Sequence, residues 1–470
     1  MEIREMKLRN AIKQGWRLAC AALAVALMVT QYSGLASAQT VNAATSESRL
    51  ALDARPGLAL YVDQAGGMTA DEVVAYALEH NGELIAARKE LAAARALVKQ
   101  ASLRANPTLD VGGSKQVNGG DNSVMVSGSL PLELGGRRST RILVAEREVE
   151  MREAAFADRE RALAAEVRAK FGEALAGVYK LGFTSDLLST EERGYRLVVA
   201  RVLEGRSAPL EQNQMLVEVN RIRSMRETED GKVQVAMFEL RNAIGMEPDA
   251  PLRLRGDFTG LVDNLPPVEE ATRLALSSRP DLLAARAAES LAAAQIEQAR
   301  AEGRPDASVN VGYQRMSSGF PVNGIDDRGQ LAPVMGTFHT ITAGVSINLP
   351  VRNKNQGAIE AAVAQSEAAK SRREFAELTV RREVAAAYAR YTSAARAMEI
   401  YRVGVEGQAD ANLKVVQKTY ELGAKTLLDY ISEQRRFIEV ENSFIDAVLD
   451  TYRARVEIAR AAGSPELIKK

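Results

Sequence analysis

Cysteine is nearly absent from this chain of 470 residues, which contains only Cys20. Histidine is almost as scarce, because His80 and His339 are the only two. They lie too far apart in sequence to form a local zinc motif. A single cysteine excludes an internal disulfide framework, and one that is removed with a leader leaves no thiolate for catalysis or metal binding. The sequence therefore predicts no metal site, no catalytic residues and no cofactor.

Long hydrophobic runs are missing as well. The apolar run from Leu18 to Val29 has 12 residues, fewer than the about 20 that a membrane-spanning helix needs. It follows several basic residues and precedes small ones, so 1–38 are predicted to be a secretory signal peptide, cleaved after Ala38 or alternatively after Ala44. Cys20 lies inside the apolar run and not after it, so we expect no lipidation.

No charge of one sign is in excess. The chain has 61 basic and 61 acidic residues, and removal of the predicted leader leaves 56 and 59. A nearly neutral mature chain lacks the basic surplus that binds phosphate backbones, so we expect no nucleic-acid partner.

Proline is scarce in a way that predicts long helices. It is absent from 132–208 and from 351–464, and it is almost excluded from helix interiors. Within the first gap, apolar residues recur at spacings of four, as at Leu163, Val167 and Phe171, which is typical of a helix face near a coiled-coil seam. Two helices of about 100 Å are expected at 1.5 Å per residue, over 138–203 and 357–422.

The long helices belong to two copies of one unit. Asn81-Gly82-Glu83-Leu84 returns as Arg279-Pro280-Asp281-Leu282, and Gly205 returns as Gly423. The two glycines follow the long helices, where a left-handed cap is common. The predicted organisation is an N-terminal extension 39–68, a first repeat 69–250, an equatorial linker 251–266, a second repeat 267–463 and a tail 464–470. Each repeat has a half-length helix (about 83–104 and 281–303) and a return helix (209–244 and 426–462).

Between the half-length and the long helix, each repeat has residues that alternate in polarity. We expect β-hairpins over 107–131 and 306–350, with Pro131 and Pro350 ending the strands and turning the chain into the helices. The second hairpin holds a 21-residue insertion, and Ser317–Gly336 is predicted to be an exposed loop. Strands of about ten alternating residues fit a membrane β-barrel.

Four strands cannot close a barrel, and an open edge cannot lie in lipid. Two chains would supply eight strands, whose interior is filled by side chains. Three would supply 12, enough for a lumen. Closure therefore favours a homotrimer embedded in lipid.

The doubled signature, the two hairpins and the two long helices resemble the TolC-type outer-membrane factors over about 69–463. The resemblance implies a mainly α fold with a small β part. A long antiparallel α-helical barrel, or tunnel, would continue β-hairpins that complete a 12-stranded transmembrane β-barrel in a trimer. It also implies a passive exit duct in the outer membrane of a Gram-negative bacterium, working with a periplasmic adaptor and an inner-membrane pump.

Leu349–Gly357 is similar to the strand-to-helix junction of the cobalt–zinc–cadmium efflux branch, which implies heavy-metal cations as cargo. Drug efflux and type I protein secretion remain alternatives. A periplasmic coiled-coil scaffold or adaptor is another, although it would not need two hairpins at matched positions. A secreted enzyme is not expected, because no nucleophile–base–acid set is present.

Residues Tyr420–Asp429 are similar to the family's periplasmic tip. The resemblance implies that Tyr420 and Lys425 hold a closed gate against Asp429 and Glu211. Lys425 stands where the family has arginine, and it lacks the bidentate fork, so a weaker bridge is expected. A plainer interpretation is that Asp429 and Glu211 favour the helix dipole near helix starts.

Gly205 and Gly423 match the family's tip turns, where adaptor hairpins dock. Both glycines would also be helix caps in any function, so docking is an additional prediction.

Overall fold

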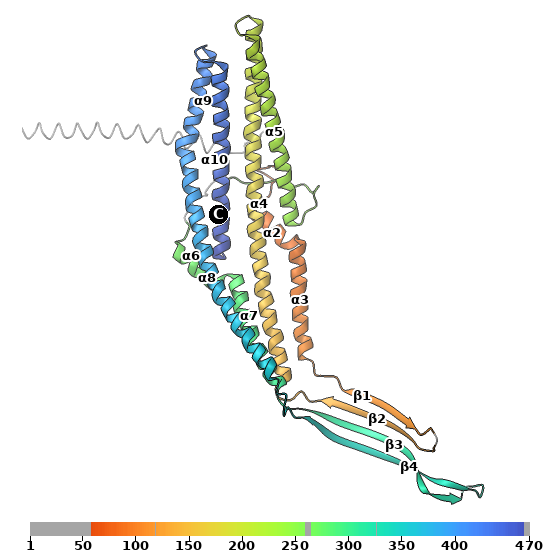
Figure 1. Cartoon of the computed structure of the whole chain (residues 1–470). Helices are drawn as coiled ribbons and strands as arrows, with labels where there is room; N and C mark the ends of the chain where they lie inside the picture. Colours follow the sequence, from red (N-terminus) through yellow and green to blue (C-terminus); the bar gives the residue numbers. More distant parts are fainter. Residues whose placement is uncertain (1–57, 118, 259–264, 326, 465–470) are drawn as a thin grey trace, which may run out of the picture. The chain divides into compact units, whose positions relative to one another are not determined.

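The computed structural model describes residues 58–117, 119–258, 265–325 and 327–464. The predicted signal peptide, its cleavage positions, most of the extension 39–68, six residues of the linker and the last six residues lie outside this described part. The elements follow one another as labelled in Figure 1. They are α2 (Ala70–His80), α3 (Gly82–Ser102), β1 (Thr108–Lys115), β2 (Asn122–Pro131), α4 (Arg137–Leu203), α5 (Pro209–Ile244), α6 (Val268–Ser278), α7 (Pro280–Glu302), β3 (Asp306–Ile325), β4 (Leu331–Asn348), α8 (Gln356–Ile400), the π-helix η1 (Tyr401–Val405), α9 (Glu406–Glu421) and α10 (Leu427–Ala462).

The same order of elements occurs twice. A short helix, a half-length helix, a hairpin, a long helix and a return helix run from α2 to α5 and again from α6 to α10. This order confirms the predicted internal duplication and the mainly α fold with a small β part.

The chain divides into two compact units. The first comprises the described residues up to Asn81, then Ala162–Ala271, and those from Val384 onward. The second comprises Gly82–Arg161 and Thr272–Glu383, and therefore holds the sheet and the half-length helices α3 and α7.

The core of the first unit lies on the helix face that the sequence pattern predicts. Val167, Phe171 and Leu175 on α4 are all at most 4% exposed. Gly172 allows a close approach, because a Cβ there would lie 2.5 Å from the ring of Tyr452 on α10. A small residue at this position therefore lets α4 and α10 pack tightly.

The second long helix differs in detail from the first. The chain is helical from Gln356 to Glu421, but Tyr401–Val405 forms a π-helix between α8 and α9. Gly404 lies in this segment, and the conformational freedom of glycine lowers its preference for a regular α-helix. Of the helices in the described residues, none is both long enough and apolar enough to cross a membrane.

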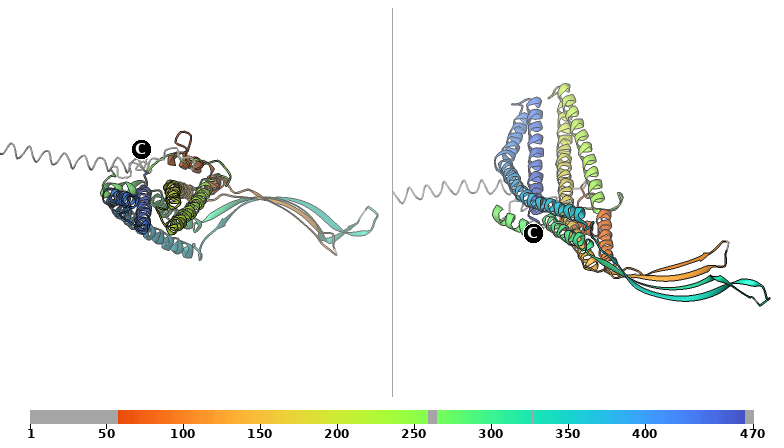
Figure 2. Two further views of the ribbon diagram at one scale, coloured as in Figure 1. Left: turned by 90° about the horizontal axis from the view of Figure 1, so that it is seen from above. Right: turned by 60° about the horizontal axis from the view of Figure 1, so that its bottom comes forward.

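The second unit contains one antiparallel sheet with the strand order β1-β2-β3-β4. Figure 2 shows the four strands lying side by side as a twisted ribbon. The two hairpins are joined through β2 and β3, where Val126 pairs with Tyr313 and Leu130 with Val309. The strands β1 and β4 each leave one edge of the sheet open.

The prediction of an exposed loop over Ser317–Gly336 is wrong. Strands β3 and β4 continue through most of the insertion, with Ser318 opposite Gly336. A register shift between Gly319 and Asn323 accommodates the irregular part. The insertion suggested a loop, but the strands extend through it, and bulges and edge strands tolerate its glycines and prolines.

Candidate functional site

The first unit contains two helical hairpins, one formed by α4 and α5 and the other by α9 and α10. Their turns have the same geometry. Gly205 has φ +70°, its N–H donates to the Val202 carbonyl at 3.0 Å, and the Arg206 N–H donates to the Arg201 carbonyl at 2.8 Å. The equivalent pair of bonds is present at Gly423, where φ is +77°. This is the Schellman cap. A Cβ at either glycine would meet nothing within 4 Å, so both turns have free space around them.

Tyr420 lies in a packed aromatic and cationic environment just before the second turn. Its ring stacks on Tyr430 with centroids 5.9 Å apart, and the Arg201 guanidinium carbon lies 6.0 Å from its centroid. The Tyr420 hydroxyl is buried without a hydrogen-bond partner in the described part of the chain. Burial, and then the negative charge of Glu211, raise the pKa of Tyr420.

Asp429 has a local structural role at the start of α10. Its carboxylate accepts from the Thr426 backbone N–H at 3.0 Å and from the Thr426 hydroxyl at 2.8 Å, which forms a capping box. The Thr426 backbone bond, followed by its hydroxyl, lowers the pKa of Asp429. Lys425 is exposed, and among the described residues no ion pair joins it to Glu211 or Asp429. Of the four predicted gate residues, Glu211 acts on Tyr420 through its negative charge, and the exposed Lys425 acts on Asp429 through its positive charge.

A buried polar pair below the tip was not predicted from the sequence. Glu191 on α4 is 1% exposed and Gln434 on α10 is fully buried. The Glu191 carboxylate accepts a hydrogen bond from the Tyr430 hydroxyl at 2.7 Å and another from the Gln434 amide. The sequence did contain an indication of this burial, because Glu191 falls on the same helix face as the buried Leu187 and Val198.

A second buried acid lies on α5. Glu218 is 1% exposed, and its carboxylate accepts from Arg221 at 2.6 Å and from Arg435 of α10 at 3.0 Å. Burial alone would raise the pKa of Glu218, but the two arginines together hold it below its ordinary value. The two acids therefore join α4 and α5 of one hairpin to α10 of the other.

The strand-to-helix junctions lie in the second unit. Pro131 is the last residue of β2, and Pro350 follows the end of β4. Gly135 and Gly136 have φ of +71° and +84°, a region that L residues with side chains rarely adopt. The chain turns here before α4 begins.

Arginines at the start of α4 bind the end of α3, which the sequence did not predict. The Arg138 guanidinium donates to the Ser102 carbonyl at 2.8 and 2.6 Å. Arg141 donates to the carbonyls of Ala101 at 3.0 Å and Leu103 at 2.9 Å. Cations and donors at a helix C-terminus satisfy free carbonyls and favour the dipole, so these bonds fix the junction.

From the strand ends near the helices up to the Tyr313–Ile341 pair, the sheet has one apolar and one polar face. Directly paired residues of an antiparallel sheet share a face, and the registers place exposed apolar side chains together on one side. Those at least 37% exposed are Leu109, Val111, Leu130, Val309, Val311, Tyr313, Ile341, Val345 and Ile347. Residues of the opposite face in this part include Asp110, Ser127, Ser129, Asn310 and Ser346. Farther from the helices the faces are mixed, because Met125, Met316 and Phe338 lie on this opposite face and Arg315 and His339 lie on the first. Strands of a membrane barrel alternate in this way between lipid and lumen.

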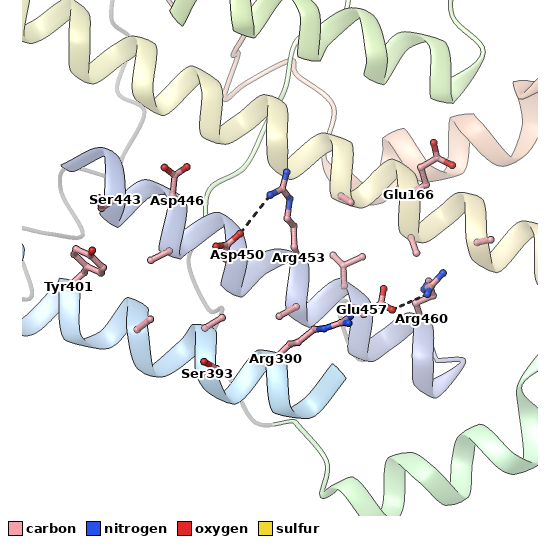
Figure 3. Close-up of a pocket in the computed structure, with 18 residues that line it drawn as sticks. Glu166, Arg390, Ser393, Tyr401, Ser443, Asp446, Asp450, Arg453, Glu457 and Arg460 are labelled. Atoms are coloured by element: carbon pink, nitrogen blue, oxygen red, sulfur yellow. Dashed lines mark hydrogen bonds and ion pairs between the residues drawn. The ribbon is translucent and has the colours of Figure 1, made fainter. Parts of the chain in front are cut away.

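A groove of about 1120 Å³ lies between α4, α8 and α10 in the first unit (Figure 3). Alanines line much of it, and its charged side chains pair locally. Arg453 lies 3.6 Å from Asp450 and 2.8 Å from Glu173, and Arg460 lies 2.9 Å from Glu457. The described lining residues include no histidine or cysteine, so the groove offers no serine–histidine or cysteine–histidine pair.

Within the described residues, no group of three or more histidine, cysteine, aspartate or glutamate side chains could hold a metal ion. His80 ends α2, where its Nδ1 lies 3.0 Å from the Tyr76 carbonyl. His339 lies on β4, where its Nδ1 is 2.7 Å from the Tyr313 hydroxyl.

Comparison with known proteins identifies the family. A family model described as outer membrane efflux protein matches residues 73–246 and 271–464. The cobalt-zinc-cadmium resistance protein CzcC of Cupriavidus metallidurans is 23% identical over 405 residues, which cover 85% of this chain and 91% of that protein. The crystal structure of CusC is similar with a TM-score of 0.68 at 19% identity, over 88% of this chain and 96% of that one. The open state of the MtrE outer membrane channel of Neisseria gonorrhoeae is similar with a TM-score of 0.65 at 20% identity, over 84% and 89%.

The two matched segments fall on the two structural repeats and together cover most of the chain. The fold of long helical hairpins and a four-stranded sheet agrees with that of the similar channels. The resemblance to the TolC-type outer-membrane factors is therefore confirmed, and the chain belongs to the outer membrane efflux protein family.

Proposed function

We propose that three copies of this chain form an exit duct across the outer membrane of a Gram-negative bacterium, continued by a helical tunnel in the periplasm. The sheet carries this proposal, because it has one apolar face, one polar face and two open edges. Open edges cannot lie in lipid. Three copies of a four-stranded sheet supply 12 strands, which close a barrel wide enough for a lumen. Pro131 and Pro350 would mark the change from barrel to tunnel.

The two faces can be tested with neighbouring substitutions. Val345 is 61% exposed on the apolar face, and Ser346 lies beside it on the polar face. An arginine on the lipid side of a barrel costs about 2–4 kcal/mol near the bilayer midplane. We therefore expect Val345→Arg to reduce the amount of folded trimer in outer membranes, and Ser346→Arg to leave it unchanged but alter ion selectivity. Equal effects of the two would contradict the assignment of the faces.

Fractionation separates the duct from a periplasmic scaffold. The duct should sediment with outer membranes and migrate as a heat-resistant trimer in detergent. A soluble periplasmic protein without a β signal would overturn the proposal, because only the membrane form requires the sheet to be completed by sister chains.

At the periplasmic tip, we propose a gate that includes Tyr420, Lys425, Glu211 and Asp429. The contacts of Tyr420 with Arg201 and Tyr430 support a packed, closed arrangement. A periplasmic adaptor that bound the open arrangement better would shift the population toward it. The free space at Gly205 and Gly423 suits docking of such a partner.

The substrates we propose are heavy-metal cations delivered by an inner-membrane pump. This rests on the similarity to CzcC, whose name specifies cobalt, zinc and cadmium resistance. A strain without this chain should become sensitive to those metals, and complementation should restore tolerance. Sensitivity to drugs alone, or a defect in protein secretion, would favour those cargoes instead. The duct itself would be passive, without catalysis.

A further inference from the structure

The buried pair Glu191–Gln434 contains two polar atoms without partners. The Gln434 amide nitrogen donates to one oxygen of the Glu191 carboxyl. The other carboxyl oxygen, Oε2, and the Gln434 carbonyl oxygen are both buried and have no hydrogen-bond partner among the described residues. The pair joins α4 to α10, and thus one helical hairpin to the other.

The chemistry of the two groups explains how both atoms are satisfied. An ionised carboxylate only accepts hydrogen bonds, and the carbonyl oxygen of glutamine also only accepts. A proton on Oε2 supplies the donor that both groups lack. The carboxylic acid and the amide would then form a cyclic pair, in which the amide N–H donates to Oε1 and the acid O–H would donate to the amide oxygen.

We propose that Glu191 is protonated while the two hairpins are packed together, that its acid group forms this cyclic pair with Gln434, and that loss of the proton loosens α10 from α4 below the tip. The consequence for channel opening rests on the duct function proposed above. The pairing and its proton dependence do not.

The groups around Glu191 are consistent with a bound proton. The pKa of Glu191 is raised, and burial is the largest cause. The hydrogen bonds from Tyr430 and Gln434 lower this pKa in part. The negative charge of Glu218 raises it further, and the positive charge of Arg221 lowers it. Burial also raises the pKa of Tyr430 far above neutral pH, so this phenol stays protonated. The titratable or charged groups facing the pair are Glu218 and Arg221 on α5, Tyr430 and Arg435 on α10, and Tyr420 and Glu421 on α9.

The sign of the pH dependence follows from the raised pKa. The packed form binds this proton more tightly than the separated form, in which water solvates Glu191. The bound proton therefore contributes fully to the free energy of packing below the ordinary glutamate pKa. This contribution is lost as pH rises through the raised pKa of Glu191. Within that window, each pH unit changes the ratio of packed to separated hairpins by up to about tenfold per chain. Glu218, with its lowered pKa, loses its contribution only as pH falls.

The experiment compares the full-length protein with its Glu191→Gln variant in detergent. Glutamine keeps the shape and supplies a permanent N–H donor toward Gln434. The melting temperature of the wild type should fall as pH rises from about 5 to about 9, and that of Glu191→Gln should change much less. The infrared carbonyl band of protonated carboxylic acids should be present at neutral pH and weaker in the variant.

Tyr430→Phe provides a second variant with a directional readout. It removes a donor that lowers the pKa of Glu191, so the pH-dependent fall in melting temperature should move to higher pH. A residue that only packs would lower the melting temperature without moving this transition.

An identical pH slope in wild type and Glu191→Gln would overturn the proposal, as would an infrared band that is unchanged in that variant. If Glu191→Gln does not fold, the proposal is still tested by the infrared band of the wild type and by the shift of the melting transition in Tyr430→Phe. Absence of both would overturn it. Conductance in planar bilayers distinguishes the two proposals. A protein that never conducts would refute the duct while the melting and infrared results stand.

Discussion

Tyr420→Phe separates a gate residue from one that only packs. The Tyr420 hydroxyl is buried without a partner among the described residues, and the proposed gate requires the tip to rearrange in the closed trimer so that a neighbouring copy supplies the acceptor. A hydrogen bond to a charged group contributes about 1.5–3 kcal/mol, and each 1.4 kcal/mol is about tenfold in an equilibrium. Removing the hydroxyl should therefore shift the closed-to-open ratio about ten- to hundredfold per chain, which single-channel recording in planar bilayers would measure as increased open probability.

Tyr452→Phe is the matched control. The Tyr452 hydroxyl is also buried without a partner in the described residues, but it lies in the core of the first unit, where its ring meets Phe258 edge-on at 5.5 Å. Burial raises the pKa of Tyr452 to about 12, so the hydroxyl stays protonated at neutral pH. Removing this hydroxyl should raise the melting temperature without changing conductance. If Tyr420→Phe behaves in the same way, its gate role is refuted.

Three further predictions concern the tip and the core. Lys425→Ala and Glu211→Ala should each raise single-channel conductance, and unchanged conductance in both would remove them from the gate. Gly423→Ala should destabilise its turn by about 1–2 kcal/mol, seen as faster hydrogen exchange at the tip, because its φ is +77°. Gly231→Ala in α5, where a Cβ meets nothing within 4 Å, should instead stabilise by up to about 1 kcal/mol. Gly172→Ala should reduce the free energy of unfolding by about 1–3 kcal/mol and so lower the melting temperature. An unchanged melting temperature would show that the Tyr452 ring can move aside.

The strands show where sequence reasoning succeeds and where it fails. Alternation located the hairpins, since period-two polarity is a local property of the chain. The prediction failed over Ser317–Gly336 because an insertion relative to the first repeat does not show whether its residues pair, whereas β3 and β4 pair through most of it. The joining of the two hairpins through β2 and β3 depends on residues far apart in sequence, such as Val126 and Tyr313.

The tip shows the same division. The glycine caps were predictable, because the left-handed turn after a helix is decided by a few adjacent residues. The roles of the acidic residues could not be predicted in this way. Asp429 is held in its own capping box, and Glu191, which the sequence reasoning missed, is buried against Gln434.

The duplication, the long helices, the hairpins and the family could be inferred from the amino-acid sequence alone, because periodicity, proline placement and glycine caps depend on residues that are close together in the chain. Which acidic side chain contacts which partner depends on how the helices pack. The burial and protonation of Glu191 depend on α10 packing against α4, with partners more than 200 residues away in the chain.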